Sequence, residues 1–167
     1  MKTSTKVGGA GGAALAVIIA AAAFIQPWEG RELRAYRDIV GVWTICDGDT
    51  HNVRPGQVAT NAECDRRLYA NLQVYHAELH KCLVVPLPPK TDRALLSWVY
   101  NVGYGAACHG GKDGRPSQVV IKANAGDLAG ACRALMDWTK AGGVERQGLV
   151  NRRMAEQQLC LEGVAEG

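Results

Sequence analysis

The sequence lacks the short motifs by which many enzyme and metal-binding classes are recognised. It has no Gly-rich phosphate loop, no CxxC pair and no tight Cys/His cluster of the kind that structural zinc needs. A strong charge is also missing: the net charge is +3, and beyond Lys2 and Lys6 the chain carries 17 basic against 16 acidic residues. This near-neutral balance gives no excess of positive charge of the kind that binds nucleic acid. We therefore expect no nucleic-acid partner, no metal and no cofactor.

Internal repeats and low-complexity linkers are absent as well. At 167 residues the chain is long enough for one compact domain with a short appendage and too short for two ordinary domains. The composition changes from uncharged and apolar to mixed after about residue 25. We therefore expect residues 1–25 to form an N-terminal segment and residues 26–167 to form one domain.

Six cysteines are spread through the chain: Cys46, Cys64, Cys82, Cys108, Cys132 and Cys160. An even, dispersed set favours disulfides, which persist in oxidising compartments, over metal ligands. Buried free thiols are the alternative. One scheme joins Cys46 to Cys64, Cys82 to Cys108 and Cys132 to Cys160. Because six cysteines allow 15 pairings, the sequence does not choose among them.

Residues 7–25 form an unbroken apolar run that follows Lys2 and Lys6. As a helix this run spans about 28 Å, close to the hydrocarbon thickness of a bilayer. Twelve of its 19 residues are Gly or Ala, and its seven large apolar side chains favour insertion by only about 2 to 4 kcal/mol. We expect a marginal anchor in the inner membrane. The lysines would keep the N-terminus in the cytoplasm, with everything after Ile25 on the outer side.

Two interpretations of the anchor stay open. The sequence Ala21-Ala22-Ala23 satisfies the small-x-small rule for signal peptidase, so cleavage there is one of them. The apolar residues continue past that site through Phe24 and Ile25, which favours an uncleaved or releasable anchor.

After Pro27 the chain alternates short helix and strand signals. Residues 28–37 have the pattern of a short helix, and residues 38–50 have the pattern of a hairpin. Thr60 and Glu63 form a capping box, which predicts a helix that reaches Cys82. Further helices are expected over residues 91–103, from Ser117, over 127–140 and over 144–161. The sum is a small, mostly helical α+β domain with its strands near the start.

Glu29, Asp38 and Thr44 stand in the spacing Glu-x8-Asp-x5-Thr. This spacing resembles the catalytic triad of the phage-type lysozymes, glycoside hydrolase family 24. The resemblance extends through four blocks in order: Asp38-Ile39-Val40-Gly41-Val42-Trp43-Thr44, Tyr100-Asn101-Val102-Gly103, Trp138-Thr139-Lys140-Ala141-Gly142-Gly143 and Gly148-Leu149-Val150-Asn151-Arg152-Arg153. With the apolar run in front, the whole resembles a signal-anchor-release (SAR) endolysin.

The resemblance implies a lysozyme-like fold and hydrolysis of the β-1,4 bond between N-acetylmuramic acid and N-acetylglucosamine in peptidoglycan. Glycoside cleavage needs one protonated carboxyl and a second group that directs water. Glu29 is expected to be the acid, because burial beside Trp28 would favour its protonated form. Asp38 is expected to stay ionised, and Thr44 to hold the attacking water. Family precedent is inversion, for which the carboxyl groups stand about 6.5–9.5 Å apart.

Several residues receive structural interpretations instead. Glu32 misses the catalytic spacing and is expected to lie in water. His76 and His80 do not form an HExxH motif and are expected to be solvated on the long helix. Arg152 and Arg153 are expected to make salt bridges at the surface or core edge, outside the active site.

Other roles are possible for Glu29 and Asp38 and for the whole protein. Glu29 and Asp38 could be an ordinary first-turn acid and a turn residue. A zinc-dependent wall amidase is the alternative enzyme, although a convincing ligand set is missing. A membrane-anchored wall-binding protein or inhibitor is the non-enzymatic alternative, and Glu29→Gln separates it from the lysozyme.

The position of the anchor predicts how activity is controlled. Only Gln26, Pro27 and Trp28 separate residues 7–25 from Glu29, so an inserted anchor would pin the site at the lipid surface. Tethering is therefore expected to inhibit, and release to give an active, soluble, monomeric enzyme in the periplasm. Because the first cysteine is Cys46, no thiol in the anchor can block the site.

Overall fold

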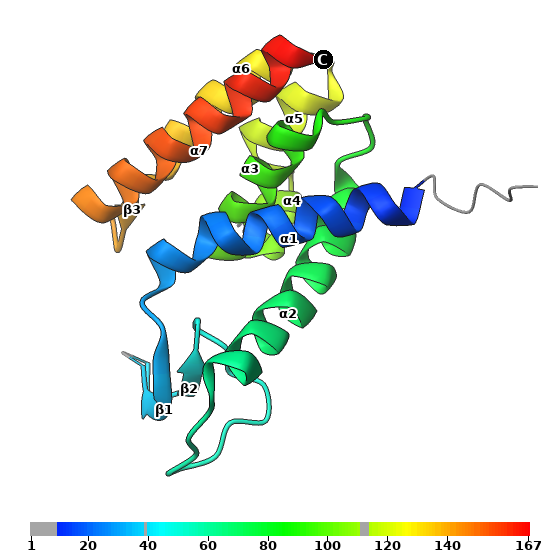
Figure 1. Cartoon of the computed structure of the whole chain (residues 1–167). Helices are drawn as coiled ribbons and strands as arrows, with labels where there is room; N and C mark the ends of the chain where they lie inside the picture. The colour runs from blue at the N-terminus through cyan, green and yellow to red at the C-terminus, as the bar shows by residue number, and fades with distance from the viewer. Residues whose placement is uncertain (1–9, 39, 111–113) are drawn as a thin grey trace, which may run out of the picture.

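The chain folds into helices and two small hairpins, which confirms the mostly helical α+β class (Figure 1). The computed structural model describes residues 10–38, 40–110 and 114–167, so Lys2, Lys6 and the start of the predicted anchor lie outside the described residues. The elements in chain order are α1 (Ala10–Glu29), β1 (Glu32–Arg37), β2 (Trp43–Cys46), α2 (Asn61–Cys82), α3 (Pro89–Val102), α4 (Tyr104–His109), α5 (Gln118–Asn124), α6 (Leu128–Ala134), a 3₁₀ turn (Leu135–Trp138), β3 (Lys140–Ala141), β4 (Val144–Glu145) and α7 (Gln147–Glu166).

Helix α1 contains most of the predicted anchor. Within the described residues, only its segment Gly11–Glu29 is long and apolar enough to cross a membrane. One face is buried against α3 and α2, and it carries Val17, Ile18, Ala21, Ala22 and Ile25. Beside this face Leu15 and Ile19 are each 50% exposed. The small alanines allow close helix packing, so the composition that weakens this run as an anchor suits it to a protein core.

The helix predicted over residues 28–37 is wrong. Helix α1 ends at Glu29 because Gly30 adopts the left-handed conformation, with φ of 59°, that commonly terminates helices. The following residues form β1, which pairs antiparallel with β2 and places Tyr36 opposite Thr44. The hairpin predicted over 38–50 therefore takes its first strand from the segment assigned to a helix, because cross-strand hydrogen bonds outweigh a short local pattern.

Helix α2 begins as predicted and joins two parts of the molecule. The Thr60 side chain accepts a hydrogen bond from the Glu63 amide at 3.2 Å, which confirms the cap. From there α2 runs away from the first hairpin and passes beneath α1 (Figure 1). We call residues 32–60, which contain β1 and β2, the hairpin lobe. We call α1 together with α3–α7 the helical lobe.

The later helices follow the prediction with one exception. Helix α3 covers most of residues 91–103, Ser117 caps α5 at Val120, and α6 with its 3₁₀ turn covers much of 127–140. The last helix begins at Gln147 and not at residue 144, because β3 and β4 form a tight hairpin there. Gly142 and Gly143 both have positive φ, as such a two-residue turn requires.

Each lobe has its own apolar cluster and disulfide support. A large cluster fills the helical lobe, and a small one joins Ala35, Ile45, Cys46, Ala59 and Cys64. The three disulfides are those of the scheme considered above: Cys46–Cys64, Cys82–Cys108 and Cys132–Cys160. The first ties β2 to α2, so the hairpin lobe is covalently fixed to the connecting helix.

Candidate active site

Glu29 lies at the point where α1 meets α7 and the turn after β2. It is the last residue of α1, and its side chain is 18% exposed. Its Oε1 accepts a hydrogen bond of 2.6 Å from Nη1 of Arg152 on α7. On the other side, a Cβ built on Gly48 would stand 3.9 Å from Glu29 Oε2, so the chain after β2 passes close to the carboxyl group. Three elements thus fix the position of Glu29.

Arg152 belongs to a buried network of charged groups in the helical lobe. Its Nε donates to Oε1 of Glu156 at 3.1 Å, and the Ser97 hydroxyl donates to the same oxygen at 2.6 Å. Arg153 pairs with the other oxygen of Glu156 at 3.0 Å and donates to Asn101 at 2.6 Å. Burial raises the pKa of Glu156, opposed by both arginines and Ser97, and lowers the pKa of Arg153 to about 10. With Glu29, two carboxylates thus face two guanidinium groups.

Arg152 and Arg153 make salt bridges, as predicted, but the expected position at the surface or core edge is wrong. Both side chains are buried, at 3% and 0% exposed, and Arg152 contacts Glu29 directly. An arginine in the first turns of an amphipathic helix ordinarily lies at the surface, and that expectation misled the interpretation. The signal was the block Gly148-Leu149-Val150-Asn151-Arg152-Arg153, which carries the family resemblance. Such a block points to a role that the helical pattern alone does not explain.

Asp38 and Thr44 lie on the first hairpin. Asp38 follows β1, and its Oδ1 accepts hydrogen bonds from the amides of Val40 at 3.0 Å and Val42 at 2.8 Å. These bonds close the turn and fix the carboxyl group. Thr44, in β2, is 3% exposed, and its hydroxyl donates to the Val42 carbonyl at 3.1 Å. Both residues therefore have structural hydrogen bonds that also hold them in one orientation.

The pKa of Tyr36 is affected by both candidate carboxylates. Burial raises the pKa of the Tyr36 phenol, and the negative charges of Glu32, Asp38 and Glu29 raise it further. Thr44 is the cross-strand partner of Tyr36, so the charges of Glu29 and Asp38 act on a residue of the hairpin that also carries Thr44. Glu32, the rival acid, is exposed on β1, as expected.

A cavity of about 140 Å³ opens beside Glu29. Its wall is largely polar and is formed by the chain after β2 and by the facing sides of α2 and α3. The residues that line it with Glu29 are Asp47, Gly48, Asp49, Thr50, His51, Asn71, Tyr75, Tyr100 and Asn101. Asp38 and Thr44 do not line this cavity. Of the three predicted residues, Glu29 alone lines this cavity.

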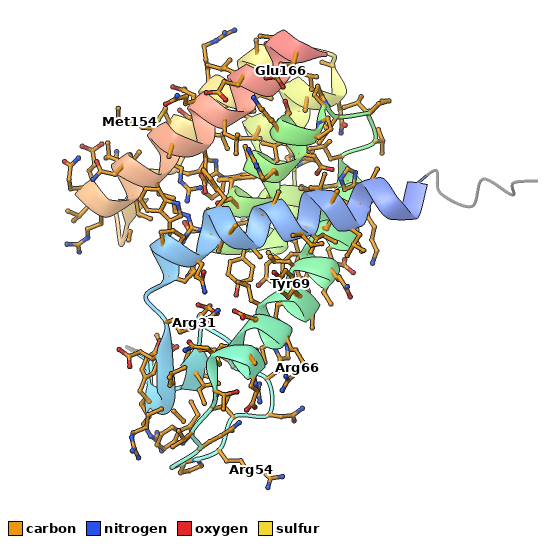
Figure 2. The ribbon with its side chains drawn as sticks, in the orientation of Figure 1. Arg31, Arg54, Arg66, Tyr69, Met154 and Glu166 are labelled. Carbon is orange, nitrogen blue, oxygen red and sulfur yellow. A yellow bond between two sulfur atoms is a disulfide. The ribbon has the colours of Figure 1, made fainter. Side chains whose placement is uncertain are left out.

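Two buried aspartates hold the cavity wall in place. Asp47 forms a two-pronged pair with Arg31, which lies where the chain leaves α1 for β1 (Figure 2). The Asp47 carbonyl accepts the Tyr100 hydroxyl at 2.9 Å, and burial raises the pKa of that phenol well above its usual range. Asp49 pairs with Arg67 of α2 at 2.7 Å. Sequence reasoning did not identify these aspartates, because their partners lie far along the chain.

His76 and His80 are not the solvated residues that the sequence predicted. Nε2 of each ring lies 3.0 Å from an oxygen of Asp92, in the first turn of α3. The side chains of His76, His80 and Asp92 are 14%, 31% and 11% exposed. Because Asp92 lies 12 residues beyond His80, helical periodicity within α2 gave no sign of this contact.

Comparison with known proteins agrees with this architecture. A family model described as phage lysozyme matches residues 26–156. The SAR-endolysin of Enterobacteria phage PA-2 is 37% identical over 158 residues, covering 94% of this chain and 92% of the relative. The muramidase domain of SpmX from Asticaccaulis excentricus superposes with a TM-score of 0.76 at 27% identity over 85% of this chain and 95% of its own. The active form of the P1 phage endolysin Lyz gives 0.76 at 26% identity, over 90% and 94%. The chain belongs to the phage lysozyme family.

Proposed function

We propose that this protein is an endolysin that hydrolyses the β-1,4 bond between N-acetylmuramic acid and N-acetylglucosamine in peptidoglycan. The family supports the reaction, and similar proteins are described as SAR-endolysins and as a muramidase domain. The observation that carries the assignment is that Glu29, held by Arg152 beside an open cavity, and Asp38, on the neighbouring hairpin, both add to the raised pKa of Tyr36. Glycoside hydrolysis requires two carboxyl groups, one as acid and one to direct water or to attack.

The surroundings of each residue suggest its role. Glu29 would donate a proton to the leaving oxygen. Asp38 would accept the proton of the attacking water. The Thr44 hydroxyl uses its hydrogen on Val42, so its oxygen is left to accept a hydrogen bond from that water. Such an arrangement gives inversion at the sugar carbon.

Helix α1 would serve first as the membrane anchor and then as a core helix. While residues 7–25 cross the inner membrane with the N-terminus in the cytoplasm, α1 cannot pack on α3, and Glu29 cannot reach Arg152. Release would bury Val17, Ile18 and Ile25 in the helical lobe and bring Glu29 into place, giving a monomeric enzyme in the periplasm. The similarity to the active form of the P1 endolysin supports this arrangement as the active one.

Retention of the anchor after release follows from the same packing. Cleavage after Ala23 would remove Val17, Ile18, Ala21 and Ala22, all of which are buried in the core. Although α1 continues without interruption across the boundary between residues 1–25 and 26–167, we assign the first segment the anchoring role and the second the catalytic role.

Glu29→Gln tests the reaction. We expect the variant to fold normally and to lose roughly 10³-fold in kcat on purified peptidoglycan, because the amide cannot donate a proton. Glu32→Gln is the matched control, since Glu32 lies three residues further on, exposed at the start of β1, and it should keep its activity. Release of reducing sugar ends from the glycan measures the cleavage. A folded Glu29→Gln variant that still cleaves would exclude the proposed acid.

Leucine at Gly11 and Gly12 tests the anchor. Both glycines are exposed and have nothing within 4 Å of an added Cβ, so the released fold should accept the change. In the membrane the two leucines favour insertion by about 1 kcal/mol together, and the glycine penalties disappear. We expect the variant to stay in the membrane fraction and to lyse poorly, while serine at the same positions permits release. Full lysis by a membrane-retained leucine variant would contradict inhibition by tethering.

A further inference from the structure

A second cavity, of about 700 Å³, lies under α1 and shares no lining residue with the cavity beside Glu29. Its walls are the alanine-rich face of α1, the end of α2 and the segment that leads into α3. Most of the wall is apolar, but His76, His80 and Asp92 also line it. These three groups have no part in the proposed hydrolysis.

The three side chains converge on one point. His76 and His80 stand one helical turn apart on α2, with ring centroids 4.4 Å apart. Their Nε2 atoms contact different oxygens of the Asp92 carboxylate, each at 3.0 Å. All three donor atoms lie within 4.8 Å of one another, and among the described residues this is the only such group of three or more potential metal ligands.

We propose that His76, His80 and Asp92 form a binding site for a divalent transition-metal ion, with zinc as the ion that two imidazoles and one carboxylate best suit. Ligands about 2.0–2.2 Å from a tetrahedral zinc stand roughly 3.3–3.6 Å apart. The observed nitrogen-to-oxygen distances of 3.0 Å would widen by a few tenths of an ångström, and because each ring contacts a different oxygen of Asp92, the carboxylate would bind through both oxygens or turn to present one. Three protein ligands leave a fourth position, which faces the cavity and would hold water.

The nitrogen ligands and the positive charges nearby favour zinc over calcium or magnesium. Arg93 lies on the same cavity wall, and its positive charge offsets the negative charge of Asp92. A large negative charge therefore does not draw cations to this site. Lys90 is directed to α7, where it pairs with Glu162 and Glu166. Affinity must therefore come from direct coordination by imidazole nitrogen, which zinc accepts and the oxygen-seeking cations do not. All six cysteines form disulfides, so no thiolate competes for the metal.

A bound ion would brace the helical lobe. It would join the end of α2 to the first turn of α3, two elements that both pack against α1. Such a site stabilises the folded chain in proportion to the free metal concentration, because the unfolded chain does not assemble the three ligands. Because the cavity of the three ligands shares no lining residue with the cavity beside Glu29, the ion would change stability and leave the proposed chemistry unaltered.

Zinc titration of the purified, disulfide-intact full chain tests the site. After treatment with chelator, zinc chloride is added at pH 8, where the imidazoles can give up their protons to coordinate. We expect calorimetry to show one ion per chain and Tm to rise with zinc concentration. Cobalt(II) should give the visible absorption of a tetrahedral site. The metal-free chain should cleave peptidoglycan at an unchanged rate, which separates this result from the proposed function.

Three variants decide the outcome. His76→Asn and His80→Asn each remove one ring nitrogen and keep a polar side chain, and both should abolish the stoichiometric isotherm and the rise in Tm. His109→Asn is the matched control, because His109 is exposed on α4 and should not affect binding. The site is excluded if the unchanged chain shows no saturable binding, if both variants still bind zinc, or if His109→Asn loses binding equally. Should one variant fail to fold, the other and the cobalt spectrum give the answer.

Discussion

The hairpin lobe and the helical lobe are held together by different means. The helical lobe buries a large apolar cluster and places its charged network, Glu29 with Arg152, Glu156 and Arg153, inside the protein. The hairpin lobe has a small apolar cluster and depends on the Cys46–Cys64 disulfide for its attachment to α2. A lobe with so little apolar area to bury needs covalent and ionic support.

The ion pairs of the two lobes differ in the same way. Glu156 is completely buried and shares its oxygens between Arg152, Arg153 and Ser97. In the hairpin lobe the carboxylates of Asp47 and Asp49 are buried, but their cationic partners reach water: Arg31 is 13% exposed and Arg67 is 21% exposed. Partial solvation weakens an ion pair and also reduces the penalty for losing it. The proposed catalytic set is divided between these environments, with Glu29 in one lobe and Asp38 and Thr44 in the other.

Arg152→Met should give the largest loss of stability, and it tests whether the buried ion pairs of the helical lobe contribute more than those of the hairpin lobe. Methionine fills much of the space of the arginine but leaves Glu29 and Glu156 with one cationic neighbour fewer in a buried site. Removing one partner of a buried ion pair typically costs about 3–5 kcal/mol. Urea unfolding followed by circular dichroism measures the change, and activity should fall as well because Glu29 loses its positioning contact.

The control is Arg146→Met, on an exposed residue just before α7. It removes the same charge and should change the free energy of unfolding by no more than about 0.5 kcal/mol. Equal effects of the two substitutions would show that the network around Glu156 contributes nothing beyond its charge.

The sequence predicted the features that depend on neighbouring residues. Thr60 and Glu63 predicted the start of α2, and the periodic apolar residues after Cys64 predicted its length. The prediction was wrong at residues 32–37, where β1 exists because β2 supplies its hydrogen bonds. A six-residue segment with no strong periodicity adopts the structure that its partner strand permits.

Contacts between distant residues explain what the sequence missed in the site. Glu29 and Arg152 are separated by 123 positions, so no local pattern could link them. The two histidines looked solvated because their partner, Asp92, lies beyond the end of their own helix. The spacing of Glu29, Asp38 and Thr44 was informative only through the family resemblance, and their catalytic roles remain a proposal.

Asp49→Asn should have a smaller effect than Arg152→Met and should depend on pH. Burial alone would raise the pKa of Asp49, but hydrogen bonds from His51, Arg67 and Asn71 outweigh it and hold the pKa below its usual value. The unfolded carboxyl therefore takes up its proton first as the pH falls. Stability from this group is present above about pH 4, the pKa of an unfolded aspartate, and is lost as the pH falls through the lower folded value.

At pH 7 we expect Asp49→Asn to cost about 1 kcal/mol, because the exposed part of Arg67 weakens the pair. Below pH 4 the difference from the unchanged chain should shrink, since protonation removes the same charge from Asp49. Free energies of unfolding measured between pH 2 and pH 7 test this, with Glu32→Gln as the control for an exposed carboxylate on the same hairpin. A difference that stays constant over the whole range would mean that Asp49 stabilises the hairpin lobe by its shape and neutral hydrogen bonds. The conclusion that a partly solvated ion pair supports this lobe would then be wrong.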